Sequence, residues 1–456
     1  MTTKDSFLYP VTPETLHKYA EDIFAPIRRG ECVTTVWVPM AGRRMWNKFI
    51  IENIRLFDKE LPNYDKYLLT YIEPLDLTEE SLTGYIRLMA KSFIEVALAN
   101  KYVKKDVVNA YRAVFNNDQA TYSLLLENLK KLLKETTDSG LEVIFFVGEF
   151  DELKFANTIF YNNLKSLWSG LYPRLHYIFL LRERVTRQEN ISKWGELNEA
   201  IMQNIIYVPL RSEKDTKYMI DYLSEEYKVK ISEAQEVIIR NLCGGHPYMI
   251  KVAVRFLARN INENFTPGQL ESLLSDYYEL KSVARAIFEA RGDKEKKVLQ
   301  LVAEGKKVSQ EYDEISTFLR NLGLTFFDKK VTNKLFGELF TKSIVGSEEK
   351  KNDSTGTNGD LHINENTGAI LVGGKTVEEL FTRQEYMILS MFLQKKDKLF
   401  TRDEIGEMLW GKESYEKYSD WAIDQLMSKL RRKLKKIGIK SSLITIRGRG
   451  YKLVSS

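Results

Sequence analysis

Positively charged side chains that could bind nucleic-acid phosphates are concentrated at the C-terminal end of the chain. From Gln425 to Ser456 the sequence holds ten Lys or Arg residues and no Asp or Glu. Apolar residues recur there at steps of three and four, which predicts a helix with one apolar face: Ile423, Leu426, Met427, Leu430, Leu434 and Ile437. Helix geometry places polar residues on the opposite face, where they could read base edges in a DNA groove: Gln425, Ser428, Lys429 and Arg432.

A basic hairpin follows this helix. Residues 442–454 predict two short strands around a tight turn, in which Gly448 and Gly450 supply backbone freedom. Arg447 and Arg449 place charge at the tip. In a basic helix followed by such a hairpin, the helix can enter a groove of the nucleic acid while the hairpin follows the phosphate backbone. A solvated cationic surface is the plainer interpretation, but the single sign of the charge and the glycine-framed hairpin favour nucleic-acid binding.

A second candidate site is a strand–loop–helix pattern near the N-terminus, in the order of a phosphate-binding P-loop. Against the pattern GxxxxGK[ST], the register we favour keeps Gly42 before the lysine position, with Arg43 replacing the lysine and Arg44 the Ser or Thr. A second register starts at Gly42 and has Lys48 as the lysine and Phe49 in place of the Ser or Thr. Both registers lack the hydroxyl that would bind Mg²⁺.

The C-terminal residues resemble a known family of DNA-binding domains. IDQLMSKLRRKL and TIRGRGYKL, preceded by FTRQEYMILSMFLQ and FTRDEIGEMLWG, resemble the winged-helix domain of OmpR/PhoB-type response regulators, although the sequence departs from the family at Leu426. The resemblance implies that Lys429 reads base edges. It also implies that Arg431 and Thr445 hold phosphates, and that Arg447 enters the minor groove. The full predicted DNA-binding set is Gln425, Ser428, Lys429, Arg431, Arg432, Thr445, Arg447, Arg449 and Tyr451.

Residues 10–290 resemble the ATPase module of STAND or ORC/Cdc6-like AAA+ proteins. After the glycine loop, LEVIFFVGEFDEL is similar to the strand that ends in an Asp–Glu pair, with Gly148 at the Asp position and Glu149 at the Glu position. LHYIFLLRERVTR is similar to the next strand, which ends in a polar sensor at Arg182 or Arg184. LCGGHPYMIKVAVRFL is similar to the turn of the helical lid. The resemblance implies ATP or ADP as a ligand.

Two Mg²⁺ ligands are missing from this pattern, which predicts nucleotide binding without Mg²⁺-dependent hydrolysis. On this interpretation the chain is not an enzyme, and its vestigial nucleotide-binding set is Gly42, Arg43, Lys48 and Glu149. The main rival is a working ORC-like ATPase acting on DNA, in which Lys48 and Asp151 restore catalysis. A scaffold whose winged helices bind protein is a second rival, which the run of lysines disfavours.

The predicted fold is an α/β P-loop-like three-layer module with a helical lid, followed by two winged-helix domains. The first winged helix carries an acidic helix, so we expect it to pack and not to contact DNA. Residues 346–359 contain no large apolar side chain and predict a flexible linker. The predicted boundaries are 1–210 for the α/β core, 211–292 for the lid, 293–345 for the first winged helix, 346–359 for the linker and 360–456 for the DNA-binding domain.

Composition limits the remaining possibilities. The chain of 456 residues has a net charge of +5, and residues 359–456 alone carry eighteen Lys or Arg against thirteen Asp or Glu. Cys32 and Cys243 lack a partner motif, which indicates a reducing compartment. The absence of a signal pattern or a long apolar run predicts a cytoplasmic protein without a membrane partner. We therefore predict a transcriptional regulator that binds double-stranded DNA, with RNA polymerase and a second copy of itself as further partners, and without a metal.

Overall fold

The computed structural model describes most of the chain from Tyr9 onward. The described residues are 9–261, 263–327, 333–345, 361–363, 370–372, 375–377, 381–395, 398–410, 420–436, 442–446 and 449–454. The predicted linker 346–359 and Arg447 lie outside them, and the side chain of Gln425 is not described. Buried apolar side chains form two clusters, one between Val11 and Ile344 and one that joins Tyr278 to residues of the C-terminal part.

The N-terminal module is built on a five-stranded sheet in the order β2-β3-β4-β1-β5, in which every neighbouring pair is parallel. Its strands are β1 (Val33–Trp37), β2 (Tyr67–Ile72), β3 (Glu142–Val147), β4 (Leu175–Leu181) and β5 (Ile205–Val208). All side chains of β1 and β4 are buried. A parallel sheet covered on both faces requires such continuous apolar runs, so the predicted α/β fold class is confirmed.

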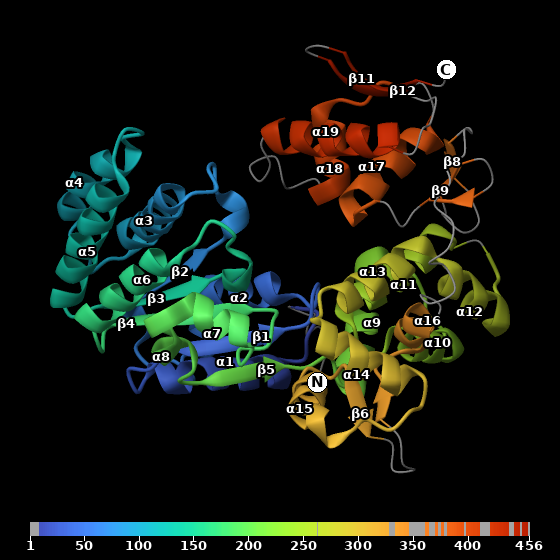
Figure 1. The fold of residues 1–456 in the computed structure, drawn as a ribbon, viewed down its shortest axis with the longest axis horizontal. Helices are drawn as coiled ribbons and strands as arrows, with labels where there is room; N and C mark the ends of the chain where they lie inside the picture. The colour runs from blue at the N-terminus through green and yellow to red at the C-terminus, as the bar shows by residue number, and fades with distance from the viewer. Residues whose placement is uncertain are drawn as a thin grey trace, which may run out of the picture.

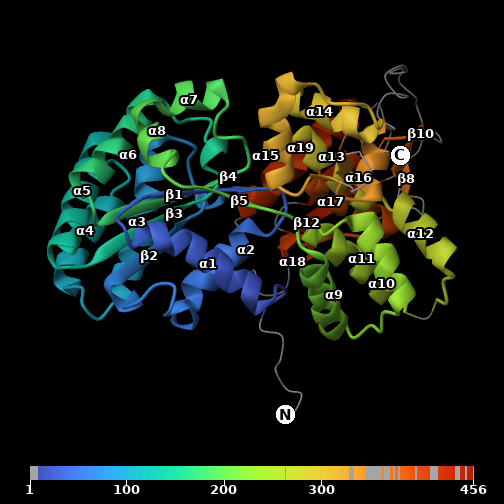
Figure 2. The ribbon, with the colours of Figure 1, turned by 90° about the horizontal axis from the view of Figure 1, so that it is seen from below.

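Helices cover both faces of this sheet (Figures 1 and 2). Helix α1 begins after Thr12, whose side chain caps it by accepting the Thr15 N–H. The α-helices of the module are α1 (Pro13–Ile27), α2 (Arg43–Glu52), α3 (Leu82–Ala99), α4 (Lys105–Asn116), α5 (Tyr122–Asp138), α6 (Thr158–Gly170), α7 (Gln188–Trp194) and α8 (Asn198–Ile201). The module also contains short 3₁₀ turns, η1 (Ile54–Phe57), η2 (Tyr64–Lys66), η3 (Pro74–Asp76), η4 (Phe150–Glu152) and η5 (Gly195–Leu197). A sixth, η6 (Gln310–Tyr312), lies later in the chain.

A helical lid and a small winged-helix-like unit follow and share the core of the α/β module. The lid contains α9 (Glu213–Tyr227), α10 (Glu233–Cys243), α11 (Pro247–Arg259), α12 (Pro267–Asp276) and α13 (Tyr278–Glu289). The next unit contains α14 (Asp293–Ala303), α15 (Asp313–Asn321), β6 (Thr325–Phe327), β7 (Asn333–Leu335) and α16 (Glu338–Val345). Acidic α15 packs on the α/β module, since Glu314 accepts from Arg184 at 2.6 Å.

Two adjacent glycines join the lid to its neighbours. A Cβ atom on Gly244 would lie 1.5 Å from the Phe336 carbonyl oxygen, and one on Gly245 would lie 2.4 Å from the Arg211 carbonyl oxygen. Both glycines also have positive φ angles, of 53° and 83°. Close backbone approach therefore requires glycine at both positions, which explains the paired glycines of the lid turn.

The C-terminal domain has its own core (Figure 1). Its elements are β8 (Leu361–Ile363), β9 (Ile370–Val372), β10 (Lys375–Thr376), α17 (Arg383–Gln394), α18 (Arg402–Trp410), α19 (Asp420–Lys436), β11 (Ser442–Ile446) and β12 (Gly450–Val454). Helix α19 and the antiparallel β11–β12 hairpin are the basic helix and hairpin predicted from the sequence. Phe400 pairs with Tyr451 and ties the hairpin to the start of α18.

Candidate nucleic-acid interface and phosphate loop

Helix α19 separates its apolar and cationic side chains as its periodicity predicts. Four side chains of the apolar stripe are at most 3% exposed: Ile423, Met427, Leu430 and Leu434. Ser428, Lys429 and Arg432 lie on the other side and are exposed. The helix is therefore fixed in the domain by one face and presents donors and positive charge on the other.

Arg431 links α19 to the hairpin. Its Nε donates to the Leu443 carbonyl oxygen at 2.6 Å, and its Nη2 donates to the Thr445 hydroxyl. Thr445 is exposed on β11 and pairs with Tyr451 across the hairpin, while Arg449 is exposed in the turn. The structure thus brings Arg431 and Thr445 together, and it gives Arg431 the role of holding the hairpin against the helix.

Tyr451 lies inside the domain and is 2% exposed. Its hydroxyl donates to the Asp424 carboxylate of α19, and Arg402 of α18 donates to the same carboxylate at 3.1 and 3.3 Å. Burial, together with this carboxylate, raises the pKa of Tyr451 to about 12. Asp424 therefore joins α18, α19 and the hairpin, and Tyr451 positions the hairpin from within the domain.

Replacing Asp424 with Ala is expected to lower the free energy of unfolding of this domain by about 1–3 kcal/mol, because Tyr451 and Arg402 both lose their acceptor. We expect DNA affinity to fall as the hairpin loosens. Asp403→Ala removes the same charge from an exposed position and serves as the control. Thermal unfolding and duplex affinity of the two variants are the measurements, and equal behaviour would contradict the positioning role.

The loop between β1 and α2 brings together part of the predicted phosphate site. Gly42 has a positive φ of 94° and precedes the first turn of α2. Arg43 is 9% exposed; its Nη2 donates to Glu149 Oε1 at 3.0 Å and its Nη1 to the Leu180 carbonyl oxygen at 3.2 Å. Arg182 donates to the same Glu149 oxygen. Three charged groups thus meet at the carboxyl edge of the sheet.

Lys48 lies apart from this group. Its Nζ is 5.6 Å from the centroid of the Tyr71 ring, and burial, followed by the positive charge of Arg44, lowers its pKa. Arg44 Nε pairs with Glu73 Oε2 at 3.0 Å. The two predicted registers therefore correspond to two separate places, and the structure joins Gly42, Arg43 and Glu149 without Lys48.

Gly148 and Asp151 have packing roles at the end of β3. A Cβ atom on Gly148 would lie 3.0 Å from the Ile72 carbonyl oxygen, which leaves little room for a carboxylate. Asp151 Oδ2 accepts the backbone N–H groups of Arg182 and Glu183 at 2.7 and 2.8 Å and so caps the end of β4. Glu149 stands between them with a left-handed φ of 47°, a strained conformation that is typical of functional positions.

His246 connects the lid to the loop between β1 and α2, a contact that the sequence did not predict. Its Nε2 donates to the Pro39 carbonyl oxygen at 2.9 Å, and its Nδ1 accepts the Met249 N–H at 3.3 Å. These bonds require a neutral ring with its proton on Nε2. Burial is the main cause that lowers the pKa of His246 to about 4. The lid therefore rests on the loop through an uncharged histidine.

Because the pKa of His246 is depressed, the unfolded chain binds a proton below about pH 6.5 and the folded chain only near pH 4. The contribution of His246 to the free energy of unfolding is fully present above about pH 6.5. It decreases as the pH drops, by about 2 kcal/mol at pH 5. His246→Gln should reduce this pH dependence. Chemical denaturation at pH 7 and pH 5 tests it, and an identical pH slope in both proteins would refute it.

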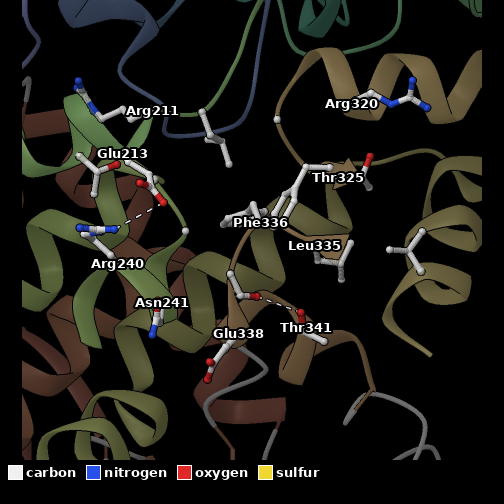
Figure 3. Close-up of a pocket in the computed structure, with 18 of the residues that line it drawn as sticks. Arg211, Glu213, Arg240, Asn241, Arg320, Thr325, Leu335, Phe336, Glu338 and Thr341 are labelled. Carbon is white, nitrogen blue, oxygen red and sulfur yellow. Dashed lines mark hydrogen bonds and ion pairs between the residues drawn. The ribbon is translucent and has the colours of Figure 1, made fainter. Parts of the chain in front are cut away.

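A cavity of about 920 Å³ lies between the lid and the first winged-helix unit (Figure 3). Arg240 faces Glu213 across its edge at 3.6 Å, and Phe336 lies between the two units. Among the described residues, no cluster of three or more His, Cys, Asp or Glu side chains could hold a metal ion. Within those same ranges, no helix is long and apolar enough to cross a membrane.

Residues 377–453 match the family described as "Transcriptional regulatory protein, C terminal". The uncharacterized transcriptional regulatory protein YvcP of Bacillus subtilis is 36% identical over 76 residues, which cover 17% of this chain and 31% of YvcP. The heme response regulator HssR of Staphylococcus epidermidis is 34% identical over 95 residues, or 21% of this chain and 41% of HssR. The chain thus spans well under half the length of these curated relatives.

Several solved structures resemble most of the chain at low sequence identity. A Walker-type ATPase of Pyrococcus abyssi has a TM-score of 0.44 and 13% identity, covering 72% of this chain and 95% of that one. The Aeropyrum pernix ORC2 protein, described in ADPNP–ADP complexes, has a TM-score of 0.45 and 13% identity, covering 76% and 98%. At this identity and TM-score the likeness assigns no residue a role.

The prediction that the chain is not an enzyme is contradicted: the solved structures that resemble most of the chain include a Walker-type ATPase. The two missing Mg²⁺ ligands alone were not a sufficient reason for that exclusion. The predicted resemblance of the C-terminal residues to an OmpR/PhoB-type winged-helix domain is confirmed. The chain carries at its C-terminal end a DNA-binding domain of the OmpR/PhoB-type transcriptional regulatory family.

Proposed function

We propose that the protein is a sequence-specific transcriptional regulator that binds double-stranded DNA, with α19 in the major groove and the β11–β12 hairpin along the backbone. The observation that carries this proposal is the exposed face of α19, where Ser428, Lys429 and Arg432 lie opposite a buried apolar stripe. On this proposal Lys429 contacts base edges and Thr445 contacts phosphates. Contacts with RNA polymerase and self-association remain predictions.

Deletion of the C-terminal domain tests this assignment. A chain ending at residue 345 retains the complete N-terminal core, and we expect it to leave duplex DNA unshifted in a low-salt gel. The full chain should retard the same duplex. Equal retardation by both proteins would move DNA binding to the N-terminal module and overturn the proposal.

The α/β module is the proposed nucleotide-responsive part of the regulator. Support comes from the loop that ends at Gly42, from the start of α2, which Gly42 leaves without a side-chain cap, and from the neighbouring Arg43. Such a helix terminus favours phosphate. A fluorescent ATP analogue should bind the full chain, and Arg43→Ala should weaken binding about tenfold or more. Arg55→Ala, at an exposed position, is the control; no binding by the unmodified chain would refute the assignment.

A further inference from the structure

Tyr278, the first residue of α13, packs against the C-terminal domain. Its ring centroid lies 3.8 Å from that of Tyr386 in α17, with 31° between the ring planes. Tyr278 is 4% exposed and Tyr386 is 9% exposed, and both belong to the C-terminal core. The following apolar residues of α13, Leu280 and Val283, belong to the N-terminal core instead. The lid thus contributes one aromatic side chain to the core of the neighbouring domain.

The lid holds this tyrosine from a firmly bonded position. Glu279, next in sequence, is 7% exposed and accepts hydrogen bonds from Tyr248 and Arg255 of α11. On the other side, the ring of Tyr277 packs edge-on against Phe256 at 5.2 Å. These contacts fix the start of α13 from both sides. Tyr278 therefore projects toward α17 from a part of the lid that is held by these contacts.

The C-terminal domain links its side of the contact to the DNA-reading helix. Glu385, one residue before Tyr386, is 2% exposed and caps α17 by accepting the Thr382 N–H. It also accepts a hydrogen bond from Lys433 of α19. The side chains of Ser428 and Lys429 remain exposed while this contact is made. Figure 1 shows the β11–β12 hairpin on the side of the domain away from α13. The contact with the lid therefore leaves the proposed DNA-binding face open.

We propose that the start of α13, centred on Tyr278, is a docking surface for α17 of the same chain, and that the docked domain is the form that binds DNA. This inference rests on the proposed function. Docking joins the lid to α19 through Tyr386, Glu385 and Lys433. A ligand that binds the docked and undocked forms with different affinity would therefore change DNA affinity, and DNA would change the affinity for that ligand by the same factor.

Photo-oxidative dityrosine cross-linking of the full chain tests the docking directly, because it joins tyrosine rings that touch. The expected product links the peptides that contain Tyr278 and Tyr386. Tyr278→Phe should keep the packing but abolish this product, and Tyr277→Phe excludes the neighbouring ring as its source. Tyr172→Phe, at a site that is 57% exposed, should change nothing. A mixture of isotopically light and heavy chains shows whether both peptides come from one molecule.

The supporting result is a cross-link within one chain that persists when saturating duplex DNA is added. Absence of the product in the unmodified chain would overturn the docking. Mixed light–heavy products would overturn it in favour of a second copy of the chain as the occupant. Loss of the product on DNA binding would overturn the claim that the docked form binds DNA. If the chain binds no duplex, the proposed function fails, while the cross-link without DNA still decides whether the domains dock.

Discussion

Leu430→Ala is expected to lower the free energy of unfolding of the C-terminal domain by about 2–5 kcal/mol. Leu430 is fully buried in the stripe that fixes α19, so truncation removes apolar burial and leaves a cavity that its neighbours fill only in part. Hydrogen exchange of peptides from β11 and β12 in the full chain measures the loss, because it reports local opening without requiring a single unfolding transition.

The adjacent residue supplies the control. Lys429 is exposed on the other face of the same helix, and Lys429→Ala should change stability by less than about 0.5 kcal/mol. It should weaken DNA binding, whereas Leu430→Ala should act through folding. If both variants destabilise the domain equally, the assignment of the two faces of α19 is incorrect.

DNA affinity should fall about 10³-fold between about 50 and 200 mM salt, the loss expected for about six phosphate contacts. The reason is the release of counterions when Lys and Arg side chains neutralise phosphates. Ten such residues follow Gln425, but Arg431 is engaged by the hairpin and Lys433 by Glu385, so fewer than ten are available. Titration of a fluorescent duplex at several salt concentrations gives the slope. A slope near zero would contradict a cationic interface.

Local patterns in the sequence were sufficient to predict the elements of the DNA-binding domain. The three- and four-residue spacing that includes Met427 and Leu430 defines one helix face without reference to the rest of the fold. Gly448 and Gly450 likewise stand close together in the sequence and indicate a tight turn, and Gly450 has a positive φ of 135°. Helix periodicity and turn glycines depend on neighbouring residues, which the sequence displays directly.

Contacts between distant residues could not be predicted in the same way. His246 and Pro39 are 207 positions apart, and neither residue type in isolation indicates a lid-to-loop hydrogen bond. Tyr451 was predicted to contact DNA, but only the fold shows that its ring is buried and that its hydroxyl bonds Asp424. Burial and long-range pairing depend on tertiary packing, which periodicity does not specify.

The candidate phosphate site shows a different limit of prediction from sequence. Motif spacing left two registers open, and only the fold separates Lys48, beside Tyr71, from Arg43, beside Glu149. The tight surroundings of Gly148 are also tertiary, because a Cβ atom there would lie 3.0 Å from the Ile72 carbonyl oxygen of β2. Missing motif residues alone therefore led to a wrong prediction of enzyme class.

The most direct test of DNA recognition by α19 is whether Lys429 reads a base. Duplexes selected from a random pool by the full chain define its preferred site, and single-base variants of that site then form a panel. Lys429→Ala should lose about 1–3 kcal/mol at the preferred site and relax preference at one base pair while the domain stays folded. Affinity and base preference that both remain unchanged in Lys429→Ala would contradict the entry of α19 into the major groove.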